Sequence, residues 1–255
     1  MARKLWNEEE LILTLDLYFK LPFGRLNRNT REVIELAQLI GRTNNSVALR
    51  LVNFAACDPY IIESGRTGMP AGIPVCMPIW ERYANNRSQL YIDAEQIRAK
   101  YKKVSVDEIL NIDLSKVAVT ERESVVKQRI HQNVFRTMVL ANYENSCAIT
   151  GINVPELLIA SHIIPWRDDE EKRLMPENGI CLSPLYDKVF DIGLITIRSD
   201  YTIAISKELK AHSKKEYYQN HFGIIENKRI TLPIEHRPNV EYLNYHYNKI
   251  FSPHN

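Results

Sequence analysis

Apolar positions recur every three or four residues in successive stretches of the first 54 residues. The first stretch, EEELILTLDLYF, follows Asn7, a good helix cap, and its acidic first turn suits the helix dipole. The second, REVIELAQLI, opens after Thr30 and closes at Gly41, and the third, SVALRLVNF, follows the capping run Asn44-Asn45-Ser46. The pattern predicts three helices joined by short turns, an arrangement typical of helix-turn-helix modules.

This periodicity loosens over residues 57–106. The stretch ESGRTGMPAGIPVCMP, residues 63–78, is rich in proline and glycine and predicts an irregular loop. Short helices are expected in IWERYANN, after Pro78, and in YIDAEQIRAKYKKV. We place a domain boundary just after these, giving a helical domain over residues 1–110 and a second domain over residues 111–255.

A longer helix is predicted from Thr120 to about Tyr143, because apolar residues keep helical spacing there while basic residues cover its other faces. After it, LLIASHII reads as a short buried strand that ends in His162 and is stopped by Pro165. A charged loop, RDDEEKR, and an Asn178-Gly179 turn lead into a second apolar run, ICL.

The next element is a short helix, PLYDKVFD, which Ser183-Pro184 should start and Gly193 should end. Beyond it, LITI and YTIAIS predict a hairpin, residues 207–221 read as helical, KRITLP as a strand and NVEYLNYHYNKIF as a last helix. Helices dominate and the strands are few and short, so the expected fold class is α+β.

Three polar side chains in this segment suggest chemistry. Asp187 and Asp191 are four residues apart on the predicted helix and therefore share one face. Carboxylates of this kind, opposite His162, suit a hard divalent cation such as Mg²⁺ or Mn²⁺. Histidine is the natural general base at neutral pH, and a metal with a base that deprotonates water describes a phosphodiester hydrolase.

The letters around these positions resemble the HNH endonucleases, the ββα-metal fold, and among them restriction-type nucleases. The resemblance rests on CAITG, ASHIIPW and NGICLSP, with a helix ending in FDIG, and extends upstream into the long helix. It implies that His162 activates the attacking water and that Asn178 orients this histidine through its backbone carbonyl. The third family position, nine residues beyond Asn178, falls on Asp187, where the family has histidine. Aspartate is a competent ligand for a hard cation, which makes this a working variant.

A second departure lies at Ser161, where many family members carry a carboxylate or a histidine as a further ligand. Serine coordinates metal poorly, which leaves Asp191 as the candidate second ligand beside Asp187; the alternative is a solvated residue near the helix end.

The N-terminal letters, WNEEE followed by GRTNNSVALR, are similar to Myb-like and related DNA-binding helix-turn-helix modules. This resemblance implies DNA contacts from residues at the second turn and on the third helix: Arg42, Asn44, Asn45, Ser46 and Arg50. Arg129 and Arg136 of the long helix are candidates for phosphate contacts, or they form a solvated face. The alternative for the first three helices is a bundle that only packs on the nuclease, and the loop at residues 63–78 either reaches DNA with Arg66 or acts as a lid.

Composition limits the remaining possibilities. A net charge of +2, with 45% apolar and 25% charged residues, is that of an ordinary globular protein, so any nucleic-acid surface must be local. The sequence has no apolar run long enough to span a membrane and no signal-like start, so we expect a cytoplasmic protein. The four cysteines form no CxxC pair, so no structural zinc is expected.

Together these features predict a helical DNA-recognition domain followed by an HNH nuclease with its core at about residues 147–197. The expected function is metal-dependent cleavage of double-stranded DNA in a restriction or host-defence system, by a homodimer, because cutting both strands of a palindrome asks for two copies. One alternative is a DNA-binding regulator whose HNH fold is inactive, and another is an unspecific or RNA-directed nuclease.

Overall fold

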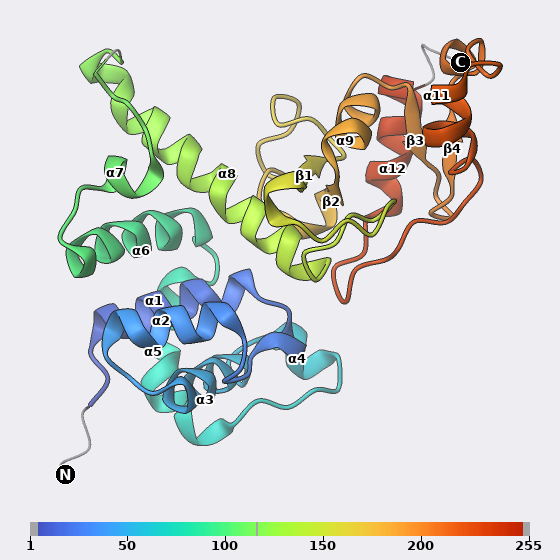
Figure 1. Cartoon of the computed structure of the whole chain (residues 1–255). Coiled ribbons are helices and arrows are strands. Elements are labelled where there is room, and N and C mark those ends of the chain that lie inside the picture. The colour runs from blue at the N-terminus through green and yellow to red at the C-terminus, as the bar shows by residue number, and fades with distance from the viewer. Residues whose placement is uncertain (1–4, 116, 252–255) are drawn as a thin grey trace. The chain divides into compact units, whose positions relative to one another are not determined.

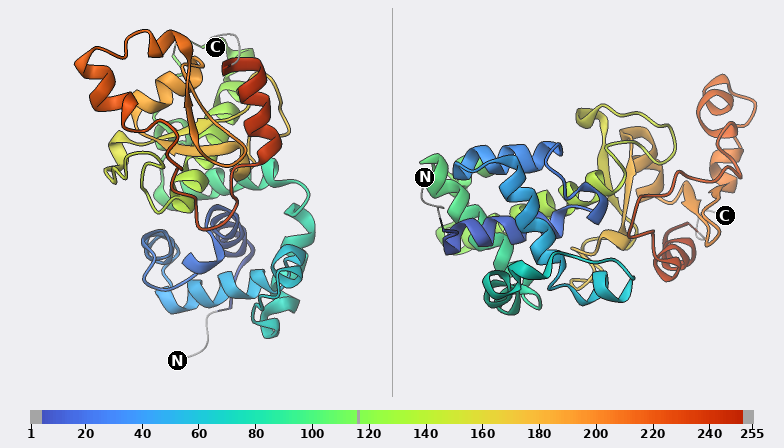
Figure 2. Two further views of the ribbon diagram at one scale, coloured as in Figure 1. Left: turned by 90° about the vertical axis from the view of Figure 1, so that its right-hand side faces the viewer. Right: turned by 90° about the horizontal axis from the view of Figure 1, so that it is seen from below.

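Helix α1 (Glu8–Lys20) is the centre of the N-terminal half of the computed structural model, which describes residues 5–115 and 117–251. A reciprocal capping box starts it: Glu10 N donates to Asn7 Oδ1 at 2.8 Å, and Asn7 N donates to the Glu10 carboxylate. Helix α1 packs against α2 (Arg31–Ile40), α3 (Asn44–Ala55), α5 (Ile73–Tyr83) and α6 (Arg87–Lys102) (Figures 1 and 2). The helices predicted for this region are therefore present.

The middle of this half contains more helix than the sequence indicated. Besides α5 and α6 it holds α4 (Pro59–Glu63) and α7 (Val106–Leu110). Helix α5 begins at Ile73, inside the predicted loop, and carries Pro78 in its interior. Pro74 in the first turn favours its start, and the buried side chains of Cys76, Ile79 and Trp80 hold it together despite the hydrogen bond that Pro78 cannot donate.

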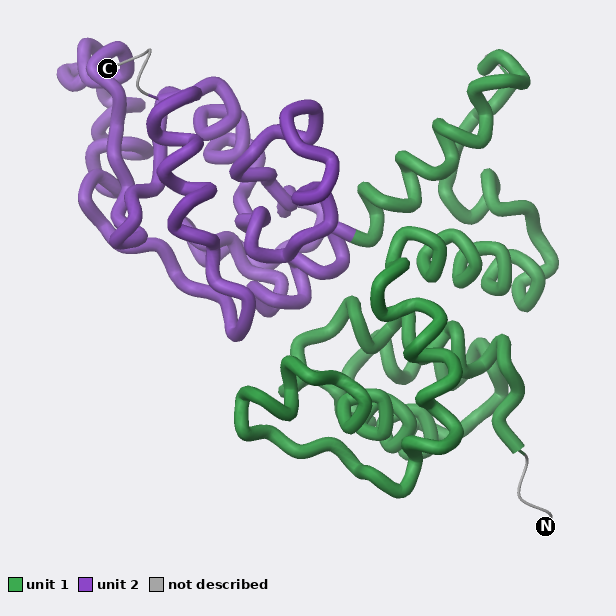
Figure 3. The backbone as a smooth tube through the Cα atoms, turned by 180° about the vertical axis from the view of Figure 1, so that it is seen from behind, with its two compact units in different colours: residues 1–134 green, residues 135–255 purple. Residues whose placement is uncertain are grey.

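The chain divides into two compact units, residues 1–134 and 135–255 (Figure 3). The division lies inside the long helix α8 (Arg122–Asn142), which occupies nearly the predicted range. The predicted boundary between residues 110 and 111 precedes this helix. The assignment of a recognition role to residues 1–110 and of a nuclease role to residues 111–255 stays a prediction.

In the second unit, β1 (Ile159–His162) and β2 (Gly179–Leu182) form an antiparallel pair with Ser161 opposite Ile180 and His162 opposite Gly179. Helix α9 (Pro184–Asp191) follows β2 directly and packs against β1 (Figure 1). Its end is the predicted one, since Gly193 has a positive φ of 76°. The order strand, loop, strand, helix is as the sequence predicts, and the fold class is α+β.

The remaining elements cover the other side of this core. Strands β3 (Ile195–Ile197) and β4 (Ile203–Ile205) form the expected hairpin. The helical segments after it are α10 (Lys207–Lys210), α11 (Glu216–Tyr218) and α12 (Val240–His246). The predicted strand KRITLP is reduced to a single bridge between Arg229 and Thr202. Phe135 and Val139 of α8 join the apolar side chains of β1, β2, α9 and the hairpin in one buried cluster.

Gly179 has a different role from the predicted one. It does not turn the chain, because its backbone is extended, with φ −120° and ψ 142°. A Cβ at this position would lie 2.3 Å from Cγ2 of Val139 and 3.0 Å from Cζ of Phe135. Glycine is therefore required for the close approach of β2 to α8, and not for its conformational freedom.

Candidate active site

His162, at the end of β1, is fixed by aromatic contacts of its ring and by a hydrogen bond of one ring nitrogen. Its ring stacks on Phe135 with centroids 3.6 Å apart, and the edge of Trp166 approaches from another side. Nε2 lies 3.1 Å from the backbone carbonyl oxygen of Arg173. A carbonyl can only accept a hydrogen bond, so Nε2 carries the proton and the lone pair is on Nδ1. Within the described residues Nδ1 has no hydrogen-bond partner, which leaves it able to take a proton.

The surroundings of His162 keep it neutral. Burial lowers its pKa from the ordinary value of 6.5 to about 4, although the hydrogen bond to Arg173 O favours the charged form. The imidazole is therefore unprotonated at neutral pH. A neutral ring with a fixed tautomer and an uncommitted lone pair can accept a proton, although a pKa of about 4 makes it a weaker base than an ordinary imidazole.

Asn178 fixes the loop that joins the two strands. Its Oδ1 accepts a hydrogen bond from Ile164 N at 2.8 Å, and its Nδ2 donates to Ile164 O at 3.2 Å and Lys172 O at 3.1 Å. Its side chain is buried, and its hydrogen bonds go to the loop backbone and not to His162. Lys172 precedes Arg173, whose carbonyl accepts from the histidine, so Asn178 and His162 are hydrogen-bonded to adjacent residues of this loop.

Asp187 and Asp191 lie on one side of α9, as their spacing predicts. Burial raises the pKa of both carboxyl groups, and the charge of Asp191 raises that of Asp187 further. The hydroxyl of Ser161, on β1, lies close enough to Asp187 to favour its charged form, yet Ser161 Oγ is buried and makes no hydrogen bond of ordinary geometry. Asp187 of α9 and Ser161 of β1 are thus neighbours, and Asp191, exposed one turn further along α9, acts on Asp187 through its charge.

The chemistry of these side chains fits a hard divalent cation, but they provide too few ligands to complete its coordination. Carboxylate oxygens suit Mg²⁺ or Mn²⁺, and a cation would relieve the repulsion by Asp191 that adds to burial in raising the pKa of Asp187. Over the described part of the chain, no three His, Cys, Asp or Glu side chains converge as a metal-binding group. A cation held here would need water or substrate oxygens to complete its coordination.

His246 is a residue that the sequence reasoning missed. This buried histidine of α12 stacks on the ring of Phe190 of α9, with centroids 3.7 Å apart, and its Nε2 lies 3.0 Å from the carbonyl oxygen of Phe190. Thr196 Oγ1 lies 2.9 Å from its Nδ1, and burial lowers its pKa to about 4. A neutral His246 therefore secures the end of α9 that carries Asp191. Only its apolar neighbours at helical spacing hint at this in the sequence.

The residues predicted to contact DNA differ in their burial and in the groups that they contact. Arg42 is buried, with 7% of its side chain exposed, and pairs with Glu10 at 2.7 Å. Asn44, Asn45 and Ser46 form the first turn of α3, where the capping oxygen comes from Thr43.

The other predicted DNA-binding arginines are on α3 and α8. Arg50 lies over the ring of Trp6. Arg129 is exposed on α8, whereas Arg136 donates to the backbone oxygens of Pro155 and Leu158 and thereby ties α8 to the segment before β1.

Comparison with known proteins bears on the same segment. The family model described as HNH endonuclease matches residues 147–198. A search of curated proteins gave no match. Across residues 5–115 and 117–251, no helix has the length and apolarity needed to cross a membrane. The matched range holds β1, β2 and α9 together with His162, Asn178 and both aspartates. The C-terminal half of the chain thus contains a domain of the HNH endonuclease family.

Proposed function

We propose that this protein is a divalent-metal-dependent endonuclease that hydrolyses phosphodiester bonds in DNA, acting in a restriction or host-defence system. The observation that carries the proposal is the state of His162: neutral, with Nε2 committed to Arg173 O and Nδ1 available. It stands on a ββα unit whose helix presents two carboxylates, within the segment that matches the family. An HNH domain has nucleic acid as its substrate class.

Each residue has a separate task in this proposal. Nδ1 of His162 takes the proton of the water that attacks phosphorus. Asp187 would hold the cation, with Asp191 as its partner on α9, and the cation supplies positive charge for the phosphate and the leaving oxygen. Asn178 and the Arg173 carbonyl keep the imidazole in one orientation and one tautomer. Low mobility of the base matters because misplacement of a catalytic group by about 1 Å can cost about 100-fold in rate.

Two further parts of the proposal concern assembly and recognition. The first unit supplies DNA binding, in line with the helical order α1, α2, α3 and the resemblance to helix-turn-helix modules. A single HNH site cuts one strand at a time, so cleavage of both strands of a symmetric sequence calls for two copies of the chain.

The test is direct incubation of the full chain with supercoiled plasmid DNA in Mg²⁺ or Mn²⁺, with a chelator as control and structured RNA in a parallel reaction. The proposal expects nicked and linear DNA in the presence of metal and intact DNA in the chelator. Intact DNA alongside degraded RNA would reassign the substrate.

Two observations favour a second candidate, a DNA-binding regulator with an inactive HNH fold. Ser161 occupies the position where the family has a stronger ligand, and no three ligating side chains converge among the described residues. This candidate predicts DNA binding without cutting in any divalent metal. Metal-dependent cleavage that His162→Ala abolishes would exclude it.

A further inference from the structure

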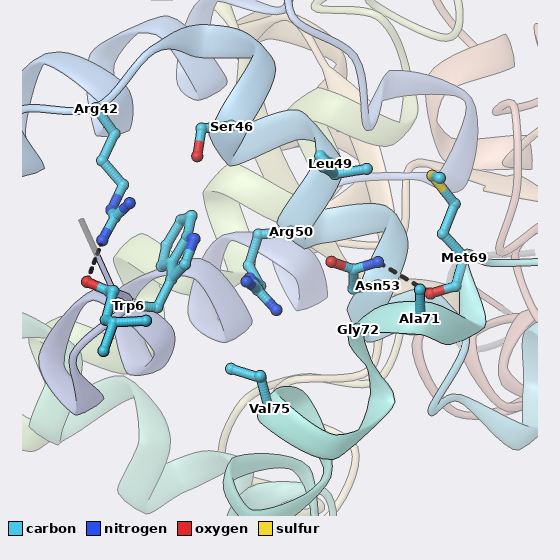
Figure 4. A pocket seen from close by; sticks show the side chains of 11 residues that line it. Trp6, Arg42, Ser46, Leu49, Arg50, Asn53, Met69, Ala71, Gly72 and Val75 are labelled. Atoms are coloured by element: carbon cyan, nitrogen blue, oxygen red, sulfur yellow. Dashed lines mark hydrogen bonds between the residues drawn. The ribbon is translucent and has the colours of Figure 1, made fainter. Parts of the chain in front are cut away.

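A pocket of about 640 Å³ lies in the first unit, on the side of α3 that carries Arg50 (Figure 4). Its volume is in the range that holds a small organic ligand, about 300–1,000 Å³. It lies between α3, the segment before α1, and the start of α5. Its lining residues are Leu5, Trp6, Arg42, Ser46, Leu49, Arg50, Asn53, Met69, Ala71, Gly72 and Val75.

The wall opposite Trp6 is fixed in place by the backbone. Asn53 Nδ2 donates to Met69 O at 2.9 Å, and Met69 N donates to Val52 O at 3.1 Å. A Cβ on Gly72 would lie 2.1 Å from Cγ of Asn53, so the loop can lie this close to α3 only with glycine at this position. The pocket is therefore preformed, and the segment that the sequence presents as an irregular loop is one of its walls.

Arg50 brings an incompletely satisfied positive charge into this pocket. Its guanidinium lies 4.9 Å from the centroid of the Trp6 ring, and its Nη1 donates to the thiol of Cys76 at 3.6 Å, a weak acceptor. Its Nε is buried without a hydrogen-bond partner, and none of the lining residues is acidic. A guanidinium in such a setting favours a ligand that supplies acceptor oxygens or nitrogens.

The rim of the pocket is apolar and exposed. Leu5, Leu49, Met69 and Val75 have 84%, 43%, 47% and 43% of their surfaces exposed. An apolar rim beside a guanidinium that lies over an indole ring suits a planar, acceptor-rich ring, because bases stack on guanidinium planes and on apolar side chains. A nucleotide combines that ring with a phosphate.

We propose that this pocket receives one nucleotide of the DNA, turned out of the base stack, with its base against the apolar rim and its acceptor atoms on Arg50. The inference rests on the proposed function, because it takes DNA as the substrate. It replaces groove reading by Arg50 with recognition of an extruded base.

The experiment measures binding of the full chain, in chelator so that no cleavage occurs, to matched short duplexes. One is fully paired, one has a single central mismatch, and one has an abasic site in place of the mismatched base. Turning out a base costs least where pairing is already lost, so the mismatched duplex should bind about tenfold more tightly than the paired one. The abasic duplex, which has no base to insert, should lose that advantage.

Two variants test the pocket in different ways. Arg50→Met removes the charge, and Val75→Trp fills the pocket without changing charge; both should abolish the preference for the mismatch. Arg31→Met is the matched control, since Arg31 is 82% exposed on α2, does not line the pocket and removes the same charge. It should keep the preference. Thermal unfolding of each variant identifies any that fail to fold, and the two pocket variants need to agree.

The contrary results are distinct. A wild-type chain without preference for the mismatch, or a preference that survives in both pocket variants, overturns the inference. Binding of free nucleoside monophosphates that Val75→Trp blocks, with no mismatch preference, would make the ligand a free nucleotide and also overturn it. If the chain still cuts plasmid DNA in these cases, the proposed function stands and only the pocket inference fails. A chain that neither binds nor cuts DNA contradicts both the proposed function and the pocket inference.

Discussion

At the scale of single residues, the candidate active site departs from the HNH pattern at Ser161 and Asp187, and in the structure these two residues are neighbours. Ser161 is 2% exposed and its hydroxyl lies near the Asp187 carboxyl. A buried hydroxyl without a hydrogen bond costs about 1–3 kcal/mol, so a cation or a bound water at this point would relieve a real penalty.

The role of Asp187 is tested by changing its charge. Asp187→Asn should depress cleavage sharply at limiting Mg²⁺, with partial recovery at high metal or in Mn²⁺, because it removes a ligand charge and keeps the shape. Asp187→His should retain activity, since it restores the family residue on the same face of α9. The measurement is cleavage rate against metal concentration.

Asp191→Asn is the companion variant for this titration. A comparable loss would make Asp191 the second ligand, whereas a mild loss would make it a residue of the helix end, consistent with its exposure. Normal cleavage by Asp187→Asn at limiting Mg²⁺ would show that the metal is held elsewhere.

Side-chain letters reveal His162 and Asn178 but not how they are connected. The histidine is held by the backbone carbonyl of Arg173, and Asn178 reaches it through the neighbouring carbonyl of Lys172. Every residue has a backbone carbonyl, so the sequence does not show which one accepts a hydrogen bond. In the sequence, this loop is only a run of charged residues. The Asn178–Ile164 and Asn178–Lys172 bonds were therefore beyond what pattern reasoning can supply.

At the scale of elements, the short antiparallel pair β1–β2 is stabilised more by the side chains that pack against it than by its own backbone hydrogen bonds. Each strand has four residues, too few for an isolated hairpin to be stable. Helix α8 contributes Phe135 and Val139 directly against Gly179 and His162. His162 and the strand that carries it thus depend on α8, the helix that the sequence assigns to the nuclease.

Gly179→Ala tests this packing. The added methyl group would meet Val139 Cγ2 at 2.3 Å, so we expect a loss of about 1–3 kcal/mol in the free energy of unfolding, the usual cost of overpacking. Val139→Ala in the same chain should recover part of that loss by making room. Denaturant unfolding measures both, with Gly24→Ala as control because its Cβ would meet nothing within 4 Å. A Gly179→Ala chain as stable as the wild type would contradict the close approach.

At the scale of the whole chain, the alternation of apolar and polar residues predicted most helices and the ββα order, because burial decides these elements. It was less successful over residues 63–78, where Pro78 and the glycines suggested a loop although α5 begins at Ile73. There, tertiary burial of Trp80 and its neighbours overrides local propensity. The late strand KRITLP was also overestimated, since only one bridge forms.

The second unit should be sensitive to mild acid. Burial lowers the pKa of His162 and of His246 to about 4, whereas in the unfolded chain both titrate near 6.5. Between pH values of about 4 and 6.5, these histidines bind protons in the unfolded chain but stay neutral in the folded chain. The free energy of unfolding therefore falls as pH is lowered through this window, by on the order of 1 kcal/mol per pH unit for each histidine.

The raised pKa of Asp187 and Asp191 opposes part of this loss, so the comparison is made against a variant. His246→Gln should show a shallower fall in unfolding free energy between about pH 7 and about pH 5, since it removes one of the two groups. Parallel pH profiles for the variant and the wild type would mean that His246 does not stay neutral in the folded chain.

The most direct test of the central claim is the single-turnover rate of DNA cleavage by the wild type and by His162→Ala at saturating metal, with DNA affinity in chelator measured alongside. If Nδ1 of His162 takes the proton from water, the variant should lose about 10²–10⁴ in rate while its DNA affinity stays within a few-fold of the wild type. A His162→Ala chain that cleaves within a few-fold of the wild-type rate would contradict the assignment of this histidine as the base.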